Sequence, residues 1–268
     1  MTIPYHPLSA DTAHIVHFIF EWLGVATGVQ LYRWLKKAEA KKRPRSPNTA
    51  QDHDFFAPSN FAVIVGCILG AGIFNKLLFV LEVPQAWEQY GWASLALGQT
   101  IVGGLIGGML GVEIAKKLVG VKHSTGDLFV MPFCVGLVVG RIGCFLAGLN
   151  DGTYGVATSL PWGMDFGDGV LRHPTQIYDM LWCVAMLILV KINYSKWQAV
   201  SGLTFKVMFA GYLLWRLLVD GIKPVPYPYL WGWSAIQWAC LVVLLGYLPF
   251  LVRDFSRLKR LNFTKNTY

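Results

Sequence analysis

Two arginines stand inside long apolar segments, where little water is available to solvate a guanidinium group. Arg141 lies within VGRIGCFLAG, and Arg216 lies within YLLWRLLVD. A charged side chain within a bilayer costs about 3 kcal/mol or more, so each arginine needs a partner or a polar cavity. A planar guanidinium holds a phosphate through two parallel hydrogen bonds. The two segments therefore predict a cavity that binds an anion, and the phosphate of a phospholipid is the obvious candidate.

Three residues are candidates for a proton acceptor beside these arginines. His173 is one of them, because histidine is the side chain best suited to general-base work near neutral pH. Asp151 and Glu21 are rivals, because an apolar wall raises the pKa of a carboxyl group. A second reading of His173, as a helix-start residue held by its neighbours, stays open.

Two further residues lie on the same helix faces as the arginines. Cys144 follows Arg141 by three residues and Asp220 follows Arg216 by four, which are the spacings of neighbours on a helix. Asp220 is expected to orient Arg216 rather than to do chemistry. Cys144 is a candidate nucleophile that could hold a lipid intermediate, although a small residue that simply fills space is the alternative.

The composition places these residues in a membrane protein. The 268 residues are 54% hydrophobic and only 14% charged, whereas soluble chains have about 25% charged residues. Apolar segments long enough for membrane helices cover residues 13–35, 61–81, 95–115, 128–147, 177–190, 203–219 and 233–252. We expect an all-α integral membrane protein with about seven transmembrane helices, folded as a single polytopic domain over residues 1–268.

The basic residues predict the orientation. Of the 23 Lys and Arg, 17 follow the first, third, fifth or seventh apolar segment. By the positive-inside rule that side is cytoplasmic, so the N-terminus is outside and the C-terminus is inside. Residues 38–58 then form a cytoplasmic linker, and 149–173 form an external loop. The predicted polar cavity opens to the outer leaflet, and the basic run at 33–45 sets topology rather than binding nucleic acid.

The cysteines and glycines indicate packing. None of the five cysteines forms a CxxC pair, and the pattern predicts no disulfide framework, no metal site and no organic cofactor. Gly103, Gly107 and Gly111 recur every four residues, and Gly66 and Gly70 have the same spacing. Such spacing predicts helices whose backbones approach closely.

Several motifs, taken in order, resemble the bacterial prolipoprotein diacylglyceryl transferases: GGLIGG, GRIGCFLAG, RHPTQIYD and GYLLWRLLVDGIK. The resemblance implies a seven-helix, multi-pass protein of the bacterial inner membrane. It implies phosphatidylglycerol as the lipid donor and the cysteine thiol of a lipoprotein precursor, or another acceptor, as the group modified. Glycerol phosphate leaves in that reaction, and no cofactor is implied.

The resemblance also assigns residues to the phosphate and lipid headgroup. Arg141 matches the arginine of the GR-x-G element, and Arg216 and Asp220 match the arginine and acid of the sixth span. Gln176 and Tyr178 match positions of the HP-x-Q-x-Y element, which begins at His173. We add Lys223 to this set because it is a cation in the adjoining outer loop.

The chain departs from the family at reactive positions. Val102 stands where the family has a histidine before GGLIG, and Cys144 stands where it has an asparagine. Asp151 is the nearest acid to a glutamate of the family, and Leu23, with Glu21 nearby, stands for a tyrosine. These changes predict a divergent member with a preserved donor site and an altered acceptor or proton chemistry.

Two other function classes remain as alternatives. The missing histidine at Val102 favours a non-catalytic phospholipid-binding or accessory membrane protein. A transporter is less favoured, because the sequence shows no inverted repeat and no polar lining of the inner half.

Overall fold

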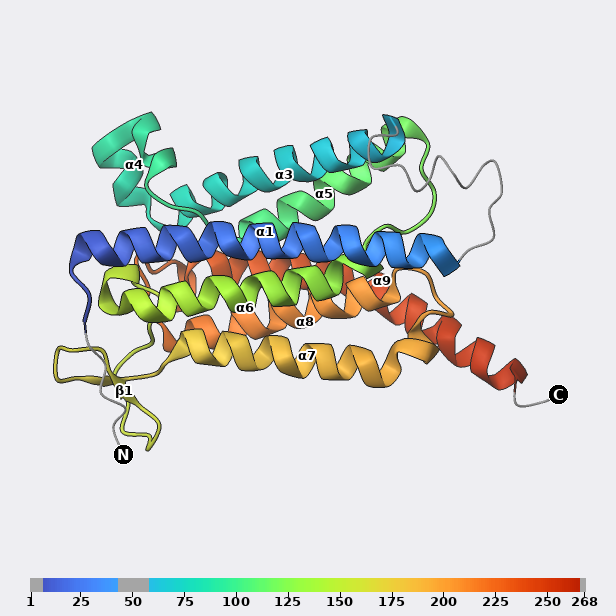
Figure 1. Cartoon of the computed structure of the whole chain (residues 1–268). Helices are drawn as coiled ribbons and strands as arrows, with labels where there is room; N and C mark the ends of the chain where they lie inside the picture. Colours follow the sequence, from blue (N-terminus) through green and yellow to red (C-terminus); the bar gives the residue numbers. More distant parts are fainter. Residues whose placement is uncertain (1–6, 43–57, 266–268) are drawn as a thin grey trace.

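The computed structural model describes residues 7–42 and 58–265 as a helical bundle (Figure 1). Within these residues seven helices have 17 residues or more: α1 (Ala10–Lys42), α3 (Pro58–Glu82), α5 (Ile101–Val119), α6 (Val130–Ala147), α7 (Thr175–Trp197), α8 (Leu203–Val219) and α9 (Ala235–Lys265). The predicted all-α fold is confirmed, and each long helix overlaps one predicted apolar segment.

Shorter elements lie between the long helices. They are the helix α4 (Pro84–Tyr90), the 3₁₀ helices η1 (Gly91–Ala96), η2 (Asp127–Phe129), η3 (Gly148–Asp151), η4 (Asp220–Ile222) and η5 (Leu230–Gly232), and the strands β1 (Met164–Asp165) and β2 (Leu171–Arg172). The two strands form one small antiparallel hairpin in which Met164 faces Arg172.

The helices have the length and composition of membrane spans. Five are individually long and apolar enough to cross a bilayer, or six if the bent pair Pro84–Ala96 and Ile101–Val119 is one span. The pair is bent by 59°. Large exposed hydrophobic side chains cover the outer faces of these helices, as lipid contact requires. The chain is a multi-pass membrane protein, and the number of spans and their orientation stay predictions.

The predicted start of the third segment is wrong. The apolar pattern begins at residue 95, but α5 begins at Ile101. The Thr100 side chain accepts a hydrogen bond from the backbone N–H of Gly103, at 3.2 Å, and so caps the helix. Residues 91–96 form η1 instead. Gln99 and Thr100 interrupt the apolar stretch only briefly, so hydropathy alone does not locate the cap.

The predicted linker at 38–58 needs a similar correction. Residues up to Lys42 belong to α1, and Pro58 begins α3. The rest of the linker, at 43–57, lies outside the described residues. Residues 149–173 contain the end of η3 and the β1–β2 hairpin, and their position outside the membrane stays a prediction.

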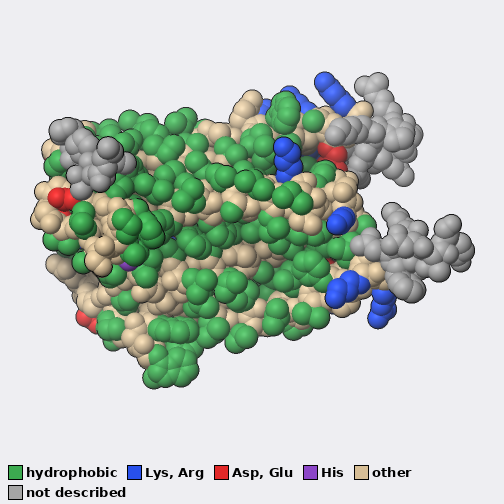
Figure 2. All heavy atoms as spheres, turned by 90° about the horizontal axis from the view of Figure 1, so that it is seen from below, with side chains coloured by type: hydrophobic (Ala, Val, Ile, Leu, Met, Phe, Trp, Pro, Cys, Tyr) green, Lys and Arg blue, Asp and Glu red, His purple; other side chains and the backbone are tan. Residues whose placement is uncertain are grey.

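Consecutive long helices alternate in direction. The C-terminal ends of α1 and α9 therefore lie at the same end of the bundle (Figure 1). Figure 2 shows Lys and Arg side chains gathered at that end, with hydrophobic side chains over most of the remaining surface. The hairpin, the end of α6 and the start of α7 lie at the opposite end (Figure 1). The alternation places the candidate site residues at this less basic end.

Glycines bring α3 and α5 into backbone contact. A Cβ added to Gly107 would lie 2.2 Å from the carbonyl oxygen of Gly70, and one added to Gly111 would lie 2.0 Å from that of Gly66. The predicted small-residue face is therefore a helix-packing surface. Close approach of this kind is the main route to helix association in a bilayer.

The same device joins α1 to α6. A Cβ on Gly24 would lie 2.6 Å from the carbonyl oxygen of Gly136, and one on Gly143 would lie 2.4 Å from the Cβ of Phe20. Gly143 immediately precedes Cys144. The close crossing therefore brings the chemistry-bearing end of α6 against the first turns of α1.

We expect Gly107→Ala to destabilise the protein by about 1–3 kcal/mol, the usual cost of overpacking. The reason is that the new methyl group meets the Gly70 carbonyl, which belongs to a helix backbone. Gly104→Ala is the matched control, because its nearest neighbour, the Asn75 Cβ, is 3.7 Å away. Thermal unfolding of both variants in the same detergent measures the difference, and equal midpoints would contradict the packing argument.

Candidate active site

A buried ion pair joins α6 to α7. The Nε of Arg141 lies 2.8 Å from Oδ2 of Asp179, and both side chains are almost completely buried. The Nε1–H of Trp215, on α8, donates to the other Asp179 oxygen at 2.6 Å. Three helices thus meet at one carboxylate, and this fixes the position of the guanidinium group.

Arg216 has a carboxylate of its own. Its Nη2 lies 2.8 Å from both oxygens of Asp220, and its Nε lies 3.3 Å from Oδ2. The predicted spacing of four residues therefore does bring this pair together. The Nζ of Lys223 lies 3.5 Å from Oδ1 of the same carboxylate.

These side chains form one electrostatic cluster. Asp179 interacts with both arginines and with Lys223 as well as with its direct partners. Three cations face two carboxylates, which leaves one positive charge. Glu82 also acts on Arg216, but its carboxylate accepts the backbone N–H of Ile236 at the start of α9, at 2.9 Å. The positive end of that helix dipole offsets part of the Glu82 charge.

Gln176 adds an unsatisfied amide to this region. Its side chain is fully buried, and among the described residues neither its Nε2 nor its Oε1 has a hydrogen-bond partner. It precedes Asp179 by three residues on α7, so the two share a helix face. Buried polar groups are nearly always paired. An amide left with open donor and acceptor positions fits a site that a polar headgroup completes.

Lys223 follows the end of α8 and gives the cluster a titratable cation. Burial and the nearby Arg216 guanidinium lower its pKa to about 8, against the opposing effect of Asp179 and Asp220. Arg141 also lowers it. The Lys223 charge is therefore present below about pH 8 and lost above it, whereas both arginines stay charged.

We expect any activity that requires a phosphate group to bind at this cluster to fall as the pH rises through about 8. The reason is that the neutral amine of Lys223 no longer attracts the anion. Lys223→Arg should move this descending limb to higher pH, since an arginine stays protonated. Lys223→Met should lower activity below about pH 8 to the level that the parent protein shows above it, and so remove the limb. Initial rates measured across the pH range for all three proteins provide the test. An unchanged limb in both variants would assign it to another group.

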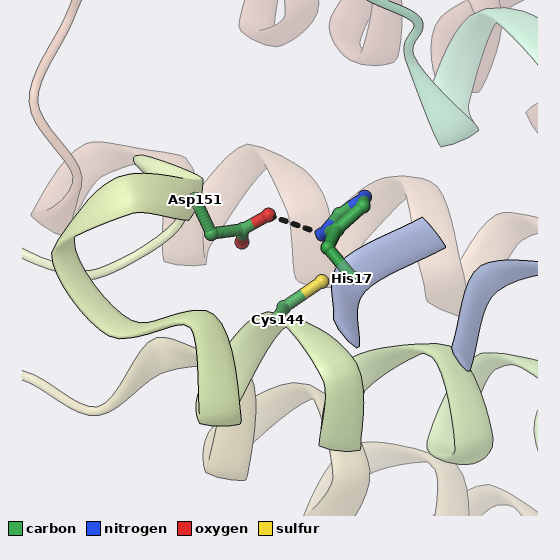
Figure 3. A group of neighbouring side chains, drawn as sticks. All are labelled: His17, Cys144 and Asp151. Atoms are coloured by element: carbon green, nitrogen blue, oxygen red, sulfur yellow. Dashed lines mark ion pairs between the residues drawn. The ribbon is translucent and has the colours of Figure 1, made fainter. Parts of the chain in front are cut away.

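A second group of side chains gathers where α1 crosses the end of α6 (Figure 3). The Nδ1 of His17 lies 2.5 Å from Oδ1 of Asp151, which ends η3. Cys144 lies between them on α6, and the donor atoms of the three residues are all within 4.8 Å of one another. The Nη1 of Arg141 donates to the Cys144 sulfur at 3.6 Å. This thiol therefore links the second group to the ion pair of Arg141 and Asp179.

Glu21 belongs to the same group through His17. Its Oε2 lies 3.9 Å from the Nε2 of His17, one helical turn away on α1. The structure thus brings together Asp151, Cys144 and Glu21, three of the four predicted catalytic residues. His17, around which they gather, was missed. Its signal was the spacing of four residues to Glu21 within an otherwise apolar segment.

His173 makes different contacts. Its Nδ1 lies 3.1 Å from the hydroxyl of Tyr178, and that hydroxyl accepts the Nε1–H of Trp162 at 2.8 Å. Its backbone bonds to Gly155 and Val156. Helix α7 begins at Thr175, so His173 precedes the helix rather than starting it. These contacts favour the alternative in which its neighbours hold it in place.

Val102 stands at the position where the resemblance described above implies a histidine. It lies near the start of α5, is fully buried and belongs to the main hydrophobic core. The side chain offers no proton acceptor there.

Comparison with known proteins decides the family. A sequence model described as prolipoprotein diacylglyceryl transferase matches residues 12–253. The chain belongs to the prolipoprotein diacylglyceryl transferase family. The match includes α1 to α8 and most of α9, and so covers both clusters of site residues.

Individual members of the family are similar over most of their length. A phosphatidylglycerol–prolipoprotein diacylglyceryl transferase of Solidesulfovibrio magneticus is 35% identical over 229 residues, covering 82% of this chain and 81% of the relative. One of Wolbachia pipientis is 31% identical over 213 residues, covering 71% and 75%. One of Geobacter sulfurreducens is 30% identical over 219 residues, covering 76% and 78%. The suspected resemblance is confirmed.

Proposed function

We propose that this diacylglyceryl transferase moves the diacylglyceryl group of phosphatidylglycerol to the cysteine thiol of a prolipoprotein. The similar proteins carry both substrates in their names. We place the reaction at the outer face of the bacterial inner membrane. The candidate site lies at the end of the bundle away from the main concentration of Lys and Arg (Figures 1 and 2), and the positive-inside rule makes that end the outer one.

One observation carries the proposal: two buried arginines are held in fixed positions by separate carboxylates at the same end of the bundle. Arg141 is anchored by Asp179, and Arg216 is anchored by Asp220. Each carboxylate uses one side of its guanidinium group, so the remaining N–H groups are pre-oriented. A fixed array of donors stabilises charge that grows in a transition state without further reorganisation.

The reaction that fits this array is a displacement at carbon. A sulfur–carbon bond forms between the acceptor thiol and the glyceryl carbon that bears the phosphodiester. The bond from that carbon to the phosphate oxygen breaks, and its electron pair leaves with glycerol phosphate. The thiol proton passes to a base or to water at the membrane surface. Arg141, Arg216 and Lys223 stabilise the departing phosphate, and Gln176 and Tyr178 bind the headgroup.

The site of thiol activation is the main departure from the family pattern. With Val102 in place of a histidine, we propose that the residues around Cys144 replace that function. His17, Asp151 and Glu21 all lie beside this thiol or one contact away. Cys144 is linked to Arg141, so an acceptor held at this cluster would face the phosphate site.

The test uses the purified protein in bilayers that contain phosphatidylglycerol labelled in its terminal glycerol. A peptide with a lipobox cysteine is added or omitted, and the same peptide with serine in place of cysteine is the control. We expect release of labelled glycerol phosphate and a diacylglyceryl mass on the cysteine peptide alone. Release without peptide modification would contradict the proposed acceptor. No release would contradict the transfer reaction and favour the lipid-binding alternative.

A further inference from the structure

We propose that His17, Cys144 and Asp151 form a zinc site whose open position takes the thiol of the acceptor cysteine. The thiol-delivery part rests on the proposed function. The metal site itself rests on the geometry of this chain. It supplies what Val102 cannot, because a thiol that coordinates zinc is deprotonated outright.

The three residues present the donor set that zinc prefers. Zinc binds imidazole nitrogen, thiolate sulfur and carboxylate oxygen at about 2.0–2.3 Å in a tetrahedron, which sets the donors on the order of 3–4 Å apart. Here all three donor atoms lie within 4.8 Å of one another, and the closest pair, His17 Nδ1 and Asp151 Oδ1, would move apart from 2.5 Å to admit the ion. The Asp151 side chain is 5% exposed and Cys144 is 7% exposed, so the ligands are not an open surface cluster. Three protein ligands with a fourth position open are the pattern of catalytic zinc.

The direction of the imidazole favours a metal over a relay of protons. In a cysteine–histidine–aspartate relay, the thiol and the carboxylate use opposite ring nitrogens. In Figure 3 the edge of the His17 ring that faces Asp151 also faces the Cys144 sulfur. The Nε2, on the far edge, lies 3.9 Å from Glu21 instead. The three donors therefore converge on one point.

Each ligand has a supporting partner of the kind that metal sites use. A zinc-bound histidine usually directs its other ring nitrogen to a carboxylate, and Glu21 stands at that position. The second oxygen of Asp151 accepts the hydroxyl of Thr153. Arg141 donates to the Cys144 sulfur. Such contacts orient the ligands and tune their charge.

The site would lie where the transfer reaction needs it. Arg141 contacts the Cys144 sulfur on one side and the Asp179 carboxylate on the other. A thiolate on the metal would therefore approach the glyceryl carbon while the leaving phosphate lies on the arginines. The His17 side chain is 35% exposed, which leaves one face of the cluster open to an incoming peptide.

The first test is metal content. The intact protein, purified in detergent, is equilibrated with zinc and freed of unbound metal before elemental analysis. We expect about one zinc per chain, lost in Cys144→Ser, His17→Gln and Asp151→Asn. Cys67→Ser is the matched control, a half-buried free thiol on α3, and it should retain the metal. Thermal unfolding of each variant separates loss of the site from loss of the fold.

Cobalt substitution identifies the ligands. Cobalt bound to a thiolate gives a sulfur-to-metal charge-transfer band, which should appear in the parent protein and be absent from Cys144→Ser. Addition of the lipobox peptide should change the visible bands, and the serine peptide should not. A protein without metal, or bands that persist in Cys144→Ser, would overturn the proposal. A lipid adduct on Cys144 itself would overturn it in favour of covalent catalysis.

The outcomes also separate this site from the transfer reaction. Transfer that persists in a metal-free protein would refute delivery of the thiol by zinc and leave the proposed function standing. Metal bound by the three residues in a protein that transfers no lipid would refute the proposed function and leave the metal site standing.

Discussion

Replacing Arg216 by alanine should lower the rate of diacylglyceryl transfer by roughly 10²–10³-fold, the usual effect of removing one preorganised donor to a developing negative charge. The guanidinium group is held by both oxygens of Asp220, so its remaining N–H groups are fixed in orientation, and the alanine variant loses them. Release of labelled glycerol phosphate measures the rate.

Two further variants make the result specific. Arg216→Lys keeps the charge but loses the planar array of N–H donors. We therefore expect it to recover only a small part of the rate. Arg253→Ala removes an arginine whose side chain is 53% exposed on α9, outside the site residues, and should leave the rate unchanged. Lys223 stays beside Asp220 in the alanine variant, so that carboxylate is not left without a counter-charge. A near-normal rate in Arg216→Ala would remove this residue from the phosphate site.

Replacing Asp179 by leucine should lower the free energy of unfolding by about 3–5 kcal/mol. The cause is that Arg141 stays buried without its partner, and a stranded buried charge is far more costly than a missing pair. Trp215 also loses its acceptor. Thermal or chemical unfolding in a single detergent provides the measurement.

The exposed pair of Asp168 and Arg172 is the control for Asp179. The Nη1 of Arg172 lies 2.6 Å from Oδ1 of Asp168, as close a contact as the one between Arg141 and Asp179. This pair, however, lies on the surface of the hairpin. Asp168→Asn should leave the unfolding midpoint close to that of the parent protein, because a surface ion pair contributes little to stability. The double variant Arg141→Met with Asp179→Leu should regain most of the lost stability while remaining inactive. If it stays as unstable as Asp179→Leu alone, the stranded charge is not the cause.

Much of the fold was predictable because hydropathy and charge report on single segments. The long apolar runs located every long helix, and the distribution of Lys and Arg separated the two ends of the bundle. Gly66, Gly70, Gly107 and Gly111 marked a packing face that the structure shows to be a contact between α3 and α5. Helix boundaries were less accurate, since the cap at Thr100 lies within a stretch that is apolar on both sides.

The site was predictable only where its residues share one helix. Arg216 and Asp220 are four residues apart and pair as their spacing predicts. The partner of Arg141 was not assigned, because Asp179 comes from another helix and nothing local links the two. His17 was missed for the same reason: it meets Cys144 and Asp151 only after α1 crosses α6. Tertiary contacts of this kind leave little trace in a single sequence.

The backbone contacts between α3 and α5 also restrict how the gene can change. Glycine is the one amino acid without a Cβ, so every missense mutation of its codon adds at least one carbon. At Gly66, Gly70, Gly107 and Gly111 that carbon would meet a backbone carbonyl of the opposite helix at 2.0–2.5 Å. No conservative replacement exists at these positions, in contrast to a leucine or valine of the core. Accommodation there requires the two helices to move apart, so each such mutation is expected to lower stability.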